Sequence, residues 1–140
     1  MSARSKARKR ALDVLYASEL RGESATEALD LAIEAMEQQA ETTQLNEYTL
    51  ELVRGVTEHC ARLDEVISSY AKGWTLTRMP AVDRNVLRLA TFEVLYVDDV
   101  PDAVAVSEAM TLVRDLSTDE SPQFVNGVLG AVLRNKPSLV

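Results

Sequence analysis

The sequence has very few of the residues that carry out covalent or metal chemistry. It contains one cysteine, Cys60, and one histidine, His59. A lone cysteine cannot form a disulfide within the chain, which fits a reducing compartment such as the cytoplasm. Together the two residues provide too few ligands for a zinc site, and no glycine-rich phosphate loop is present. Since no catalytic set can be assembled, the sequence predicts neither an enzyme nor a bound cofactor.

Helix breakers and long apolar runs are also scarce. The 140 residues include only 4 Pro and 5 Gly, and 46% are hydrophobic, which argues against a largely disordered chain. No apolar run approaches the roughly 20 residues that a transmembrane helix needs, so no membrane association is expected. The length suits one compact domain, or two small halves packed together.

Acidic residues are missing from the first ten residues, where all the charged side chains are basic: Arg4, Lys6, Arg8, Lys9 and Arg10. The whole chain has a formal charge of −7, so the rest of the chain carries −12. This distribution is typical of a protein that holds a polyanion at one place, because each cation that neutralises a phosphate releases a counterion. A mitochondrial presequence and a solvated tail without function are the alternatives.

Apolar residues recur with a period near 3.6 along the chain, and alternating apolar–polar runs are few. The pattern predicts helices over about 2–20, 24–38, 46–70, 80–97, 102–116 and 121–137. Either Ser2 or Ser5 opens the first of them, and Gly22 stops it. The third could break at Gly55 or near Leu63, which gives six or seven helices. Because no strand is predicted, the fold class is all-α.

The first helix has an apolar side formed by Ala7, Ala11, Val14 and Leu15. On a helical wheel Lys6 and Lys9 point away from this side, while Arg8 and Arg10 flank it on opposite edges. The helix can therefore pack on the rest of the protein and present cations outward, with Tyr16 near Lys9. We expect replacement of Arg8 and Arg10 together by Ala to weaken binding of the polyanion and to leave helicity and thermal stability nearly intact.

Aromatic residues are few, so one on a basic face could stack on nucleic-acid bases. Phe124, at the start of the last helix, is a candidate; a core position is the alternative. Gly127 and Gly130 each cost about 1 kcal/mol relative to Ala in a helix. Their presence suggests close packing or the approach of another backbone.

Two carboxylates lie on or near the apolar side of the helix predicted over 80–97. Glu93 falls among Val86 and Leu89, and a buried carboxylate needs hydrogen-bond donors or an opposite charge. A structural contact to another helix is favoured for Glu93, with partner binding as the alternative. Asp83, in the first turn, could complement the helix dipole or reach a basic group of a partner.

Five segments form a specific pattern when taken together. They are residues 8–16 (RKRALDVLY), 55–64, 74–93, 100–109 and 124–129 (FVNGVL), in order over nearly the whole chain. The pattern resembles the NusB family of bacterial transcription antitermination factors. Two departures, Pro122 before Phe124 and Gly130 where the family often has an acidic residue, concern the detail of the last helix.

The resemblance implies two packed helical bundles, residues 1–74 and 75–140, that together form one compact domain. It implies binding of single-stranded boxA-type antiterminator RNA from ribosomal RNA operons, together with the small-subunit ribosomal protein NusE, in the elongation complex of RNA polymerase. By motif match, the RNA surface would consist of Arg4, Lys6, Arg8, Lys9 and Arg10, with Tyr16, Tyr70, Arg88 and Phe124 as further candidates. NusE would bind near Asp83 and Arg78.

Other readings stay open at this point. A similar domain occurs at the front of ribosomal RNA cytosine methyltransferases, although the chain ends at Val140 without room for a methyl-donor domain. A helical adaptor that binds only proteins is a second alternative. DNA binding is less attractive, because no convincing pair of recognition helices is found. The sequence does not decide between a monomer and a homodimer.

Overall fold

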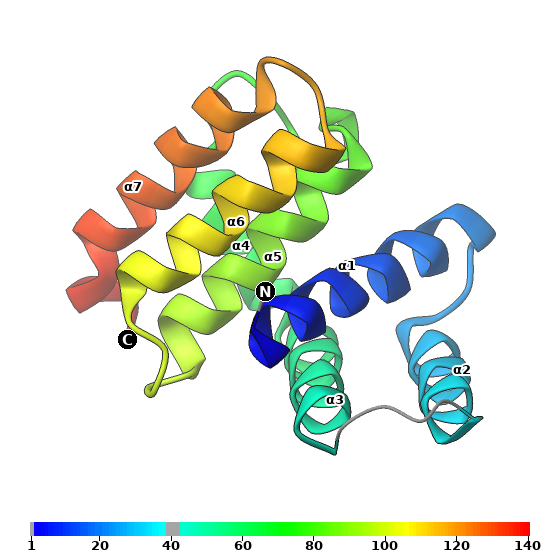
Figure 1. Cartoon of the computed structure of the whole chain (residues 1–140). Helices are drawn as coiled ribbons and strands as arrows, with labels where there is room; N and C mark the ends of the chain where they lie inside the picture. Colours follow the sequence, from blue (N-terminus) through cyan, green and yellow to red (C-terminus); the bar gives the residue numbers. More distant parts are fainter. Residues whose placement is uncertain (1, 39–42) are drawn as a thin grey trace. The chain divides into compact units, whose positions relative to one another are not determined.

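The computed structural model describes residues 2–38 and 43–140. Within these ranges it contains no strand, one short 3-10 helix and seven α-helices (Figure 1), which confirms the all-α prediction. The helices are α1 (Ala3–Arg21), α2 (Ala25–Gln38), α3 (Thr43–Glu58), α4 (Cys60–Tyr70), η1 (Leu76–Arg78), α5 (Ala81–Tyr96), α6 (Asp102–Leu116) and α7 (Ser121–Leu139). None of the described helices has both the length and the apolar character that a membrane span requires.

The chain divides into two compact units, Met1–Glu58 and His59–Val140. The sequence predicts a division after Trp74, whereas here α4 and the loop that follows it, up to Trp74, fall in the second unit. The physical reason is packing, because α4 contacts α5 and α7.

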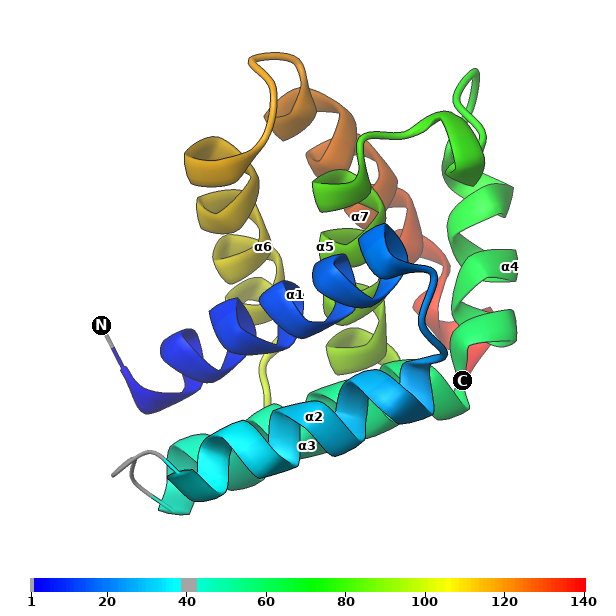
Figure 2. The same cartoon turned by 90° about the vertical axis from the view of Figure 1, so that its right-hand side faces the viewer.

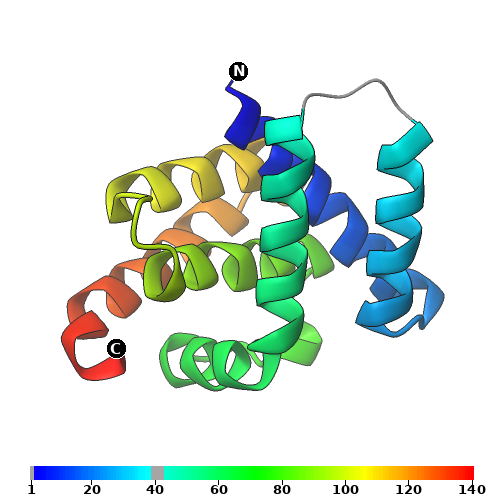
Figure 3. The same cartoon turned by 90° about the horizontal axis from the view of Figure 1, so that it is seen from below.

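The first unit consists of α1, α2 and α3, each in contact with the other two. The helices α2 and α3 run alongside each other in opposite directions, and α1 crosses them (Figure 3). Of the two predicted starts, Ser2 and Ser5, α1 uses Ser2, whose Oγ accepts a hydrogen bond of 3.1 Å from the Ser5 amide. It ends at Gly22, which has a left-handed φ of 64°.

The core of the first unit joins small residues of α1 to larger residues of α3. Ala7 and Ala11 are fully buried, which allows the two helices to approach closely. Across from them α3 buries Leu52, Val53 and Val56. This packing fixes which face of α1 is left for solvent.

The second unit is arranged around α5, which lies between α4 and α6 with α7 alongside (Figure 2). Side chains on nearly all sides of α5 are buried, as expected for a central helix. They include polar residues as well as apolar ones: Asp83, Asn85, Val86, Leu87, Leu89, Ala90, Thr91, Phe92, Glu93 and Val94.

Two predicted helix boundaries were wrong. The long helical region breaks at His59, which has non-helical angles (φ −105°, ψ 13°), and not at Gly55 or Leu63. The His59 ring stacks on Tyr96 with a centroid distance of 4.0 Å, a contact that is distant in sequence. In addition, Pro137 lies inside the last turn of α7 and does not end it. A proline there removes only one backbone donor from a helix that is about to end.

Candidate nucleic-acid interface

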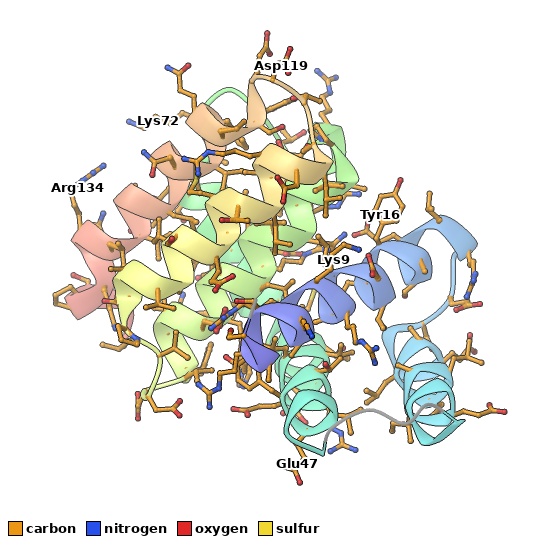
Figure 4. All side chains as sticks on the ribbon, in the orientation of Figure 1. Lys9, Tyr16, Glu47, Lys72, Asp119 and Arg134 are labelled. Carbon is orange, nitrogen blue, oxygen red and sulfur yellow. The ribbon has the colours of Figure 1, made fainter. Side chains whose placement is uncertain are left out.

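The outward face of α1 carries cations and one aromatic ring. Lys6 is exposed, and the Lys9 side chain is 40% exposed. Tyr16 is 36% exposed and lies two turns after Lys9, on the same side of the helix (Figure 4). The wheel prediction for these three residues is therefore confirmed.

Lys9 forms an ion pair within α1. Its Nζ lies 2.6 Å from Oδ1 of Asp13, one helical turn further on. Both side chains are exposed, and pairs of this kind contribute only about 0.3–0.5 kcal/mol. Lys9 can therefore exchange this carboxylate for a phosphate at small cost.

Arg8 is placed differently from the prediction. Only 4% of the residue is exposed, although the wheel put it at an edge of the apolar side. Its guanidinium carbon lies 5.7 Å from the ring centroid of Tyr48 on α3, and that of Arg4 lies 4.3 Å from the same centroid. Tyr48 is itself buried, so two of the five cations contribute to the packing of α1 on α3. The expectation that replacing Arg8 leaves stability nearly intact is not compatible with this burial.

In the second unit the candidate aromatic residue Phe124 is half-buried at the start of α7. Its ring meets the edge of Trp74, with a centroid distance of 4.9 Å and an interplanar angle of 72°. Sequence reasoning used Trp74 as a boundary marker and did not predict this pair. Tyr70, also half-buried, is the last residue of α4.

Arg88 is held by other residues of the second unit. Its Nε and Nη2 donate to the two carboxylate oxygens of Asp64 on α4, at 2.7 and 3.0 Å. Nη1 donates to Oδ1 of Asn85 at 3.3 Å, and the Arg88 side chain is 15% exposed. This two-point pairing links α4 to α5, so a phosphate would have to share the guanidinium with Asp64.

The candidate partner residue Asp83 is fully buried in the first turn of α5. Its Oδ1 accepts a hydrogen bond of 2.5 Å from the Ser117 hydroxyl, at the end of α6. Among the described residues Oδ2 finds no hydrogen-bond donor. The carboxylate therefore fixes the junction of α5 and α6 and is not displayed at the surface.

Arg78 is exposed at the end of η1. A neighbouring residue that sequence reasoning missed, Arg84, holds this segment in place. Its Nη1 donates to the carbonyl oxygens of Leu76 and Met79, at 2.7 and 3.1 Å. The guanidinium thus ties η1 to the start of α5.

Glu93 and the two glycines of α7 complete the set singled out by sequence. Glu93 is 2% exposed, so its predicted burial is confirmed. A Cβ added at the exposed Gly127 would meet nothing within 4 Å, and one at Gly130 would meet only Nη1 of Arg134, at 3.4 Å. Close packing within the described chain is therefore not the reason for either glycine.

The chain is similar to known proteins over nearly its whole length. The NusB family profile matches residues 5–134. A transcription antitermination protein NusB from Nocardioides sp. (strain ATCC BAA-499 / JS614) is 71% identical over 139 residues, which cover 99% of each chain. A relative of the same name from Arthrobacter sp. (strain FB24) is 55% identical over 140 residues, covering 100% of this chain and 99% of the relative.

One similar solved structure contains a partner. It is described as the antitermination factors NusB and NusE in complex with double-stranded RNA. Its matching chain has a TM-score of 0.82 and 29% identity, and the alignment covers 96% of this chain and 98% of that one.

Proposed function

The chain belongs to the NusB family, and we propose that, as a transcription antitermination factor of that family, it uses the outward face of α1 to bind RNA. The RNA is a single-stranded boxA-type element of ribosomal RNA operons, and the protein partner is NusE. The assembly acts on the elongation complex of RNA polymerase, which places the protein in the cytoplasm. The solved relative described with NusE and double-stranded RNA supports NusE and an RNA as the two ligands, while the single-stranded form is part of the proposal. Neither an enzymatic activity nor a cofactor is part of the proposal.

The observation that carries the proposal is the face of α1 formed by Lys6, Lys9 and Tyr16. Two cations and an exposed ring lie together on a helix whose opposite side is fixed by packing on α3. The cations can neutralise phosphates, and the ring can stack on an unstacked base. Arg10 is half-buried at the edge of this face. The guanidinium groups of Arg4 and Arg8 instead contact the ring of Tyr48 on α3.

Residues of the second unit supply selectivity in this proposal. Phosphate contacts position a protein on RNA but do not read its sequence. The half-buried rings of Phe124 and Tyr70 would provide stacking surfaces for bases of a single strand. Arg88, restrained by Asp64, would contribute one directed donor group.

The proposed NusE-binding region includes Arg78 and the junction around Asp83. Outside its first ten residues the chain carries −12, which favours a basic protein partner. Asp83 is not a suitable site for testing NusE binding by mutation. Because it is fully buried, Asp83→Lys would put an unpaired ammonium in the interior and disturb folding. The exposed Arg78 gives the cleaner test. Arg78→Ala removes its hydrogen-bond donors without adding a carboxylate that would attract a basic partner, so it should weaken NusE binding while RNA binding by the protein alone is kept.

The test of RNA binding is a fluorescence-anisotropy titration of a boxA-type RNA and of a scrambled RNA, with and without NusE, at two salt concentrations. We expect selective binding that NusE strengthens. The Lys6→Ala/Lys9→Ala double variant should bind more weakly. The slope of log binding constant against log salt concentration should become shallower by about 1.4, since each single-strand phosphate contact contributes about 0.7. Arg54→Ala, which removes an exposed cation from α3, serves as the matched control and should change little.

Trp74 provides a second readout, because it is the only tryptophan and contacts Phe124. Binding of RNA at Phe124 should change its intrinsic fluorescence. Equal and salt-erased binding of both RNAs would contradict the proposal as a whole. Selective binding without a fluorescence change would contradict only the role of Phe124.

A further inference from the structure

A groove between α1 and α2 is not used by the proposed function. It has a volume of about 280 Å³ and lies within the first unit. Its walls are formed mostly by small and aliphatic side chains, namely Val14, Ala17, Ser18, Ala28, Leu31 and Ala32. Small side chains along both helices leave space between them that a larger side chain from outside can fill.

Leu31 on the α2 wall of this groove is 48% exposed. Exposed leucines are common on protein surfaces and need no explanation when they stand alone. Here the leucine borders an apolar concavity, an arrangement that marks an interaction site more often than an isolated side chain does. The groove therefore offers an anchor point for an apolar residue of a partner.

The surroundings of Leu31 are acidic. Glu27 and Glu34 lie four residues before and three residues after it, so both carboxylates flank it on the same face of α2. Asp30 is adjacent, and all three residues are exposed. No lysine or arginine occurs in the sequence between Arg21 and Arg54. A basic partner segment is thus favoured over a nucleic acid at this surface.

Arg21 also lines the groove, at the end of α1. Its Nη1 lies 3.9 Å from Oε1 of Glu23, which is likewise in the lining. The nearby carboxylate offsets the arginine charge, so the acidic character of α2 dominates the rim. The lining residues of α1 lie on a different side of the helix from Lys9 and Tyr16.

From these features we propose that the groove binds a basic amphipathic helix of a protein partner. An apolar side chain of that helix inserts between α1 and α2 and contacts Leu31. Lysine or arginine residues beside it pair with Glu27 and Glu34. This is the helix-in-groove mode of recognition, in which an apolar face lies in a groove and its rim charges select the partner. Because the groove and the cationic face occupy different sides of α1, one chain can hold RNA and the partner helix at the same time.

The test uses the full chain and a fluorescein-labelled amphipathic peptide of leucine and lysine as the probe. A peptide of the same composition, scrambled so that its leucines do not share one helical face, is the reference. We expect anisotropy to show binding of the amphipathic peptide and at least about tenfold weaker binding of the scrambled one. Leu31→Gln should weaken binding of the amphipathic peptide about tenfold, whereas Leu116→Gln, at a leucine of α6 that is 42% exposed, should leave it unchanged.

The charge requirement is tested by the Glu27→Gln/Glu34→Gln variant, which should bind the peptide more weakly and with a smaller salt dependence. These side chains are exposed, so their replacement should not disturb folding. The variant therefore still tests the proposal if Leu31→Gln impairs folding of α2. Equal binding of both peptides, or equal losses in the Leu31 and Leu116 variants, would overturn the proposal. RNA binding by all these variants should match that of the unaltered chain, so the outcome is independent of the RNA-binding proposal.

Discussion

The helices α1 and α5 both carry charged residues that the sequence marks as functional, but they place them in different environments. On α1, Lys6 and Lys9 face solvent, whereas Asp83 and Glu93 on α5 are at most 2% exposed. A solvated cation keeps its hydration until a phosphate replaces it, so its removal costs little folding energy. A buried charge must be balanced within the fold, so its loss changes stability first. The difference teaches that exposure, more than residue type, separates binding residues from structural ones.

The largest expected effect is a loss of stability when Arg88 on α5 loses the carboxylate of Asp64, which balances its charge. Asp64→Ala leaves a guanidinium that is 15% exposed without its two-point partner. Hydrogen bonds to charged groups contribute about 1.5–3 kcal/mol, so we expect the free energy of unfolding to fall by about 2–3 kcal/mol in urea titration. Glu65→Ala is the control on the same helix, because Glu65 pairs with Arg62 at 2.8 Å but is 71% exposed.

The control should lose no more than about 0.5 kcal/mol. If Asp64→Ala and Glu65→Ala lowered the free energy of unfolding equally, Asp64 would not be needed to balance the charge of Arg88. A gain in RNA affinity by Asp64→Ala at unchanged stability would instead show that Asp64 restrains Arg88 from RNA.

An effect of intermediate size should distinguish Arg8 from Lys9, two neighbouring cations of α1. Arg8→Ala removes a nearly buried stem and a guanidinium that faces Tyr48, so we expect a loss of about 1–2 kcal/mol in stability. Lys9→Ala should leave stability within about 0.5 kcal/mol and weaken RNA binding instead. Thermal unfolding and RNA anisotropy on the same preparations check the pair. An Arg8→Ala protein of normal stability would place Arg8 with the solvated cations, contrary to its burial.

The features that sequence predicted well are local in the chain. The start of α1 at Ser2 and its end at Gly22 depend on residues within one turn, and the exposure of Lys6 and Lys9 follows from helical periodicity. Burial of Glu93 followed from the same periodicity. Local rules were therefore sufficient for the outline of α1 and for its outward face.

The features that sequence missed join residues distant in the chain. Arg8 is buried because Tyr48 of another helix receives it, and no wheel of α1 contains that residue. The contact of Trp74 with Phe124 likewise depends on how helices of the second unit pack. The break at His59 is a further case, since its ring stacks on Tyr96. Periodicity identifies a buried face but not the neighbour that covers it.

The smallest expected effect comes from removing the N-cap of α1 at Ser2. Ser2→Ala removes the side chain that accepts the Ser5 amide, and the loss of an N-cap costs about 0.5–1 kcal/mol. We expect amide exchange to quicken in the first turn only, because the helix further on is fixed by α3. Since Arg4 and Lys6 lie in or beside that turn, RNA affinity should fall two- to fivefold, an effect of about 0.4–1 kcal/mol.

Ser24→Ala is the matched control, because Ser24 Oγ accepts a hydrogen bond of 3.2 Å from the Glu27 amide at the start of α2. It removes a cap of the same kind from a helix that lacks basic residues. We expect a similar loss of stability and unchanged RNA affinity, since no proposed RNA contact lies there. If both variants lost RNA affinity equally, the loss would come from general loosening of the first unit. If only Ser2→Ala lost it, the order of the first turn of α1 would itself be part of RNA binding, because the cations there would have to be held in place before they meet the phosphates.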